Sequence, residues 1–68
     1  MIDMLTIGDI RRAGFCVRGS LAHAERLGLD RRALARVGLP IKDVEKIDDE
    51  NVRRCVETAK KRISDERQ

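Results

Sequence analysis

The residues that end helices place the strongest limit on what this chain can fold into. Glycines interrupt the apolar pattern at Gly14 and Gly28, and a third, Gly38, stands two residues before Pro40. Glycine adopts the left-handed backbone conformation that commonly ends a helix, and proline cannot continue one. No long helix can therefore run through the first half of the chain, which is predicted to fold as short helices joined by tight turns.

Capping residues indicate where these helices begin. Thr6 has the form of an N-cap, with Asp9 three residues later as the acid of a capping box, and Asp30 is a second N-cap candidate. Such side chains hydrogen-bond to backbone N–H groups that have no partner in the first helical turn. The first three helices are therefore predicted over residues 6–13, from residue 17 or 20 to residue 27, and over residues 31–37.

Two further helices are predicted in the second half. Pro40 can open the fourth, because its missing N–H group is harmless at a first helical position. Asp48 is expected to cap the fifth. The apolar stripes are Ile41, Val44 and Ile47 in the fourth helix and Val52, Cys55, Val56, Ala59 and Ile63 in the fifth. Weak surface ion pairs are expected for Asp49–Arg53, Glu50–Arg54 and Glu57–Lys61.

No segment alternates convincingly enough to predict a strand. We therefore expect an all-α fold: one compact domain over residues 1–68, with four to five short helices and frayed ends at residues 1–4 and 64–68. Phe15 is the only aromatic residue, so aliphatic side chains must build the core. A core of this size rarely supplies more than about 3–5 kcal/mol of net stability, which leaves little room for a deep catalytic cleft.

Catalytic and metal-binding patterns find no support in the sequence. The single His23 and the separated Cys16 and Cys55 do not make a zinc ligand set, and we expect no metal and no cofactor. His23 is predicted to be a satisfied or surface histidine, and both cysteines small buried thiols. An acidic group is more simply explained by helix capping than by a metal site: Asp43, Glu45, Asp48, Asp49 and Glu50. The protein is predicted not to be an enzyme.

A helix-turn-helix pattern covers the middle of the chain. The motif needs a small residue where two helices cross, a glycine in the turn and apolar residues that fill the angle between the helices. The residues at those positions are Ala24, Gly28, Leu29, Leu34 and Val37. This register turns Leu34 and Val37 inward and directs Arg31, Arg32 and Arg36 outward, where a recognition helix contacts DNA. Double-stranded DNA is the leading predicted partner.

A second register follows from a resemblance to a known family. The segments "TIGDIRRAG", "VR" and "ERLGL" resemble the DNA-binding region of MerR-type regulators, and "RVGLPIKDVEKI" resembles the helix that follows there. The resemblance implies that the reading helix is the second one, with Arg18 near its start as the contact residue. The wing hairpin of that family has no counterpart after "ERLGL".

A looser resemblance suggests a different function. The order "GFCVRG", "GLD" and "GLP" is similar to small helical proteins encoded in tailed-phage and prophage gene clusters. It implies, as the alternative to DNA binding, a virion, assembly or host-factor-binding protein that acts through an apolar helix face. A homodimer is compatible with either function.

Charge and location complete the sequence-based expectations. Charged residues make up 40% of the chain, yet the net charge is only +3, which permits an acidic partner without requiring one. With no signal peptide and no apolar run of membrane length, we expect a cytoplasmic protein without membrane contact, in the host cytoplasm or virion if phage-encoded.

Overall fold

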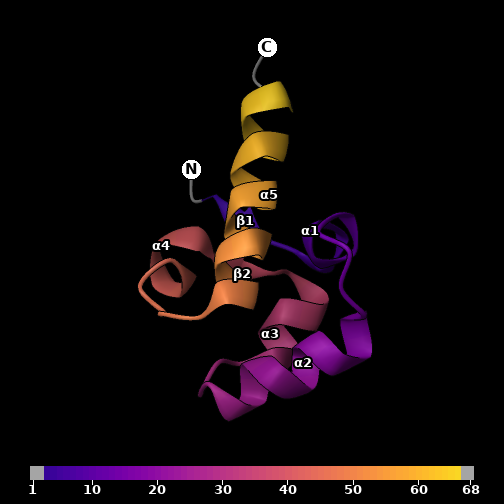
Figure 1. Cartoon of the computed structure of the whole chain (residues 1–68), viewed down its shortest axis with the longest axis vertical. Helices are drawn as coiled ribbons and strands as arrows, with labels where there is room; N and C mark the ends of the chain where they lie inside the picture. Colours follow the sequence, from indigo (N-terminus) through magenta and orange to yellow (C-terminus); the bar gives the residue numbers. More distant parts are fainter. Residues whose placement is uncertain (1–2, 67–68) are drawn as a thin grey trace.

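The computed structural model describes residues 3–66 and folds them into five helices and a small two-stranded sheet (Figure 1). The helices are α1 (Ile7–Arg12), α2 (Val17–Arg26), α3 (Arg31–Arg36), α4 (Ile41–Val44) and α5 (Glu50–Glu66). The strands are β1 (Met4–Leu5) and β2 (Leu39–Pro40). The expectation of a small, mainly α-helical domain is confirmed.

The prediction that no strand forms is wrong. β1 and β2 pair antiparallel, with Met4 opposite Pro40 and Leu5 opposite Leu39. Strands of two residues carry no alternation that a sequence pattern could show. Gly38 makes the pairing possible, because its φ is +98° and a Cβ built there would lie 2.5 Å from the Leu5 carbonyl oxygen.

Most helix boundaries lie at the predicted caps and glycines. Thr6 and Asp9 form the capping box of α1, and Gly14 and Gly28 follow α1 and α2 with positive φ. α2 begins at Val17, the earlier of its two predicted starts.

Two predicted helix starts need correction. Pro40 is the N-cap of the single-turn α4 rather than its first residue. Asp49 caps α5 instead of Asp48, accepting hydrogen bonds from the N–H groups of Asn51 at 2.9 Å and Val52 at 3.1 Å. The fraying of residues 1–4 and 64–68 stays a prediction; in the described part, Met4 lies in β1 and α5 continues to Glu66. Residues 1–2 and 67–68 lie outside the described part.

The core lies where α5 packs against α1, β1 and α4. Cys55, Val56 and Ala59 are buried on α5, as the apolar stripe predicts, and Val44 of α4 is fully buried. Ile10 of α1 packs into the same cluster.

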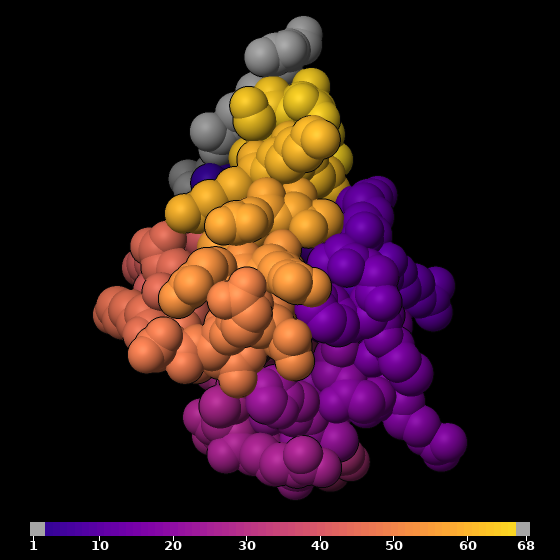
Figure 2. Space-filling model, in the orientation of Figure 1, coloured from indigo at the N-terminus to yellow at the C-terminus, as the bar shows by residue number. Residues whose placement is uncertain are grey.

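The described fold has two regions, which we name the corner and the body. The corner is residues 17–37, which comprise α2, the turn and α3. The body is the remainder of the described fold: β1, α1, β2, α4 and α5. The corner lies at the end of the molecule opposite the C-terminal turns of α5 (Figure 1; magenta in Figure 2). It contacts the body through α1 and contributes Ala24 and Leu34 to the common core.

Candidate nucleic-acid interface

The corner is built by local hydrogen bonds. The Gly28 N–H donates to the Glu25 carbonyl at 3.0 Å, which closes α2. The Asp30 carboxylate accepts from the N–H groups of Arg32 at 3.1 Å and Ala33 at 3.2 Å, which opens α3. The predicted glycine stop and aspartate cap are therefore confirmed, and they join two helices within a four-residue connection.

The inward side of the corner agrees with the helix-turn-helix pattern at all but one position. Ala24 and Leu34 are buried, and Leu29 is half-buried against the core. The prediction that Val37 faces inward is wrong, because its exposed fraction is 67%. α3 ends at Arg36, and at Val37 the φ of −120° already departs from the helix, so the chain turns outward before Gly38 returns it to the core.

The three arginines of α3 share its outer face. Successive residues of an α-helix are about 100° apart, so positions 31, 32, 35 and 36 lie within an arc of about 140°, and position 34 lies outside this arc. Leu34 is 3% exposed, whereas Arg31, Arg32 and Arg36 are all exposed. This is the placement that the helix-turn-helix register predicts.

The arginines of the corner are mostly free of acidic partners. Arg31 forms an ion pair with Glu25 at 3.4 Å, and both side chains are more than half exposed, so the attraction is weak. Arg32 and Arg36 form no ion pair with any described residue. Arg18, the contact residue in the MerR-type register, is exposed in the first turn of α2, and its side chain forms no hydrogen bond or ion pair with a described residue.

Charge is concentrated in the corner. The corner contains five arginines and two acidic residues, a net charge of +3 with His23 neutral, which equals the net charge of the whole chain. The remainder of the sequence therefore sums to zero. Sequence reasoning named four of these arginines; the fifth, Arg26, is exposed at the last position of α2.

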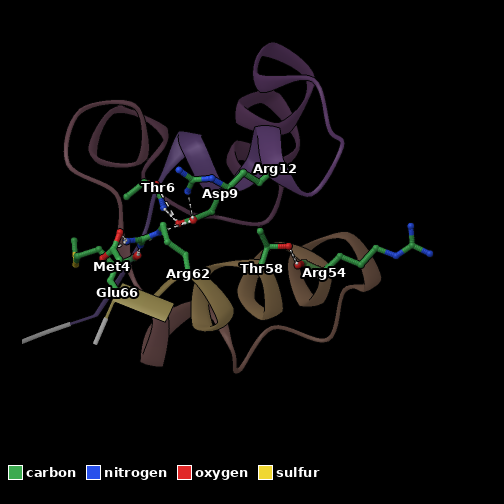
Figure 3. A network of polar contacts seen from close by, with 8 residues as sticks. All are labelled: Met4, Thr6, Asp9, Arg12, Arg54, Thr58, Arg62 and Glu66. Carbon is green, nitrogen blue, oxygen red and sulfur yellow. Dashed lines mark hydrogen bonds and ion pairs between the residues drawn. The ribbon is translucent and has the colours of Figure 1, made fainter. Parts of the chain in front are cut away.

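A buried ion pair, missed by sequence reasoning, holds the body together (Figure 3). Asp9 is 0% exposed and accepts from Arg62 Nε at 2.7 Å and from Arg62 Nη2 at 3.3 Å. Arg62 Nη2 also donates to the Met4 carbonyl at 3.1 Å. This one guanidinium therefore links α5 to α1 and β1.

Asp9 keeps its charge in the buried site. Burial alone raises the pKa of this carboxyl group, but hydrogen bonds from Arg62 and from the Thr6 N–H and hydroxyl outweigh burial. The pKa of Asp9 therefore lies below its ordinary value. Arg62 has its own pKa raised by the same hydrogen bond. The pair has a structural role, and we name Asp9 and Arg62 the latch.

A polar contact joins the corner to Asp49, the residue that caps α5. His23 Nε2 and Asp49 Oδ2 lie 2.8 Å apart, so His23 is satisfied, as expected. The pKa of Asp49 is lowered by the Val52 N–H and then by His23. Because Asp49 is engaged here, the expected Asp49–Arg53 pair is replaced by contacts of Arg53 with Glu50 and Asp48.

Some of the other surface charges of the body form exposed ion pairs. Glu50–Arg54 forms at 3.6 Å, as predicted, and Glu45 pairs with Lys60 at 3.1 Å. The predicted Glu57–Lys61 pair is not among the ion pairs of residues 3–66. In that range no three His, Cys, Asp or Glu side chains are grouped closely enough to hold a metal ion. In the described chain, no helix is long and apolar enough to cross a bilayer.

The two cysteines occupy different environments. Cys55 is buried, and burial raises the pKa of its thiol. Cys16 is exposed, so the prediction that both are buried is wrong for this residue. It is the N-cap of α2, and the N–H groups of Gly19 and Arg18 lower its thiol pKa. Its neighbour Phe15 packs against the core instead.

Comparisons with known proteins found no matching family model, no matching curated protein and no matching solved structure.

Proposed function

We propose that this protein is a non-catalytic binding module that contacts double-stranded DNA through the corner. The observation that carries the proposal is the coincidence of shape and charge. The outer face of α3 presents Arg31, Arg32 and Arg36, and the corner that contains it holds a net charge equal to that of the entire chain. Arginines supply charge-assisted hydrogen bonds to phosphates and to the edge of guanine.

The shortness of α3 favours phosphate contacts over extensive base reading. Six residues at about 1.5 Å rise per residue make a helix of about 9 Å, less than the width of the major groove. A single corner can therefore contact only a few base pairs. Binding should depend mainly on phosphates, and a homodimer would extend the contact surface.

The alternative, a phage or prophage assembly protein, has less support from the surface. It needs an apolar helix face, and the apolar side of α5 is covered in the body by α1, β1 and α4. Val37 is the one large apolar side chain that residues 3–66 leave exposed. The alternative stays a prediction that capture of a host or virion protein would test.

Titration of a mixed-sequence duplex at several salt concentrations tests the proposal. Fluorescence anisotropy should show binding that weakens steeply with salt, because each neutralised phosphate releases condensed counterions. Arg32→Gln and Arg36→Gln should each reduce the magnitude of the log–log salt slope by about 1. Arg53→Gln is the matched control, because it removes one positive charge from an exposed arginine of α5 that lies outside the corner and beside Asp48 and Glu50.

Two outcomes would overturn the proposal. The first is an absence of binding at micromolar protein and low salt. The second is an equal loss of affinity in Arg53→Gln and Arg32→Gln, which would show that the corner has no special role. If Arg18→Gln has the large effect and Arg32→Gln has none, the contact surface is α2 and the MerR-type register is the correct one.

A further inference from the structure

A cavity of about 430 Å³ lies between the corner and the body. Its floor is apolar and includes the nearly buried Leu34 and the half-buried Leu29 and Val52. Its exposed lining residues include Cys16, Arg26 and Asn51, which place its mouth between α2 and the start of α5. The volume falls in the range of pockets that hold small organic molecules, about 300–1,000 Å³.

Both regions contribute to the walls. The corner supplies Leu29 and Ala24, and the body supplies Val52 and Cys55. A chain of 68 residues has few apolar side chains to spare, and close packing is the norm in protein interiors. A molecule that filled this space would bury apolar surface that the protein itself leaves uncovered.

The charged side chain that lines the mouth is an arginine. Arg26 lines the cavity, and its side chain forms no hydrogen bond or ion pair with a described residue, so its guanidinium is available to a ligand. Within the described fold no aspartate or glutamate lines this cavity, although the chain contains 12 acidic residues. The remaining polar lining residues are Ser20, Asn51 and His23, and the last is held by Asp49.

We propose that this cavity binds a small amphiphilic monocarboxylate, with its aliphatic chain between the corner and the body and its carboxylate at Arg26. The apolar floor excludes a charged group, and the arginine at the mouth favours an anion over a cation. The proposal is independent of DNA binding, because the α3 arginines do not line the cavity.

Three probes with the same chain length separate these contributions. Decanoate, decanol and decylamine share an apolar chain and differ in charge, and each is titrated into the full protein below its aggregation concentration while backbone amide shifts are followed by NMR. Decanoate should saturate one site with a dissociation constant below about 1 mM, and decylamine should bind at least tenfold more weakly. The alkylation rate of the exposed Cys16 should fall as decanoate saturates the site.

Two variants locate the site. Ser20→Leu projects an isobutyl group into the cavity and should weaken decanoate at least tenfold, whereas Ser64→Leu, the same change on the exposed end of α5, should not. Arg26→Gln changes an exposed side chain and should weaken decanoate about fivefold to tenfold while decanol is unaffected.

The proposal fails if decanoate shows no saturable binding, if decylamine binds equally well, or if neither Ser20→Leu nor Arg26→Gln affects decanoate. It also fails if sedimentation shows a dimer that already protects Cys16 without added ligand, because a second copy would then occupy the cavity. If Ser20→Leu does not fold, the Arg26→Gln comparison between decanoate and decanol decides the question.

Discussion

The interactions that stabilise the corner differ in kind from those that stabilise the body. In the corner, hydrogen bonds between near neighbours, such as those of the Asp30 cap, define the geometry, and its charged side chains are largely free. In the body, Asp9 and Arg62 are 53 positions apart and form a buried bidentate pair. The body therefore buries one charged pair that contributes to its own stability, whereas four of the five arginines of the corner form no ion pair with a described residue.

Removal of the Asp9 carboxylate should have the largest effect on stability. Asp9→Ala leaves Arg62 without its main partner and the Thr6 N–H without its acceptor. Breaking a buried pair from one side costs about 3–5 kcal/mol, which is close to the whole stability of a domain of this size. Urea denaturation or circular dichroism should find the variant mostly unfolded. A loss below about 1 kcal/mol would contradict the role of the latch.

Acid should weaken the same latch without a mutation. Because the folded-state pKa of Asp9 lies below its ordinary value, the folded state binds this proton less readily than the unfolded state does. The stabilisation is therefore complete above the ordinary aspartate pKa of 3.8 and is lost as pH falls through the lowered folded pKa. Urea midpoints measured between pH 2 and pH 6 (roughly the range in which aspartates titrate) should fall toward the acid end. If Arg62→Met shows the same pH slope as the wild type, the pair is not responsible.

Gly38 should tolerate substitution poorly. Gly38→Ala would place a methyl group 2.5 Å from the Leu5 carbonyl oxygen on a backbone with a φ of +98°. Strain and displacement of the β1–β2 pair together should cost about 2–3 kcal/mol. Gly19→Ala is the matched control: it lies within α2 with no heavy atom within 4 Å of the added Cβ, so it should stabilise by about 0.5–1 kcal/mol. Thermal melts of both variants measure the contrast, and equal shifts would contradict it.

Loss of the Asp30 cap should have a smaller effect on stability. The effect should be confined to the corner. Asp30→Ala removes both side-chain hydrogen bonds at the start of α3 and should cost about 1 kcal/mol. Amide hydrogen exchange should accelerate in α3 more than in α5. Asp43→Ala is the matched control, because it removes an exposed acid from α4. It should leave amide exchange in α3 and α5 unchanged. Uniform acceleration in Asp30→Ala would show that the corner and the body unfold as one unit.

The contrast between the regions also explains what could be predicted from the sequence. Gly28 and Asp30 act on residues next to them, so their roles follow from local spacing. The Asp9–Arg62 pair could not be predicted in this way, because it depends on how α1 and α5 pack. The prediction for Val37 is wrong for a related reason: helical periodicity places it inward, but the return of the chain to β2 ends the helix at Arg36.

Chemical-shift mapping with a short DNA duplex tests the central claim most directly. The perturbed backbone amides should cluster in residues 31–36 and the neighbouring turn, and they should recover as salt is added, while the amides of α5 shift little. Perturbations centred on α5, around Arg54 and Lys61, would move the interface to the body. An unchanged spectrum at low salt would contradict DNA binding by the corner.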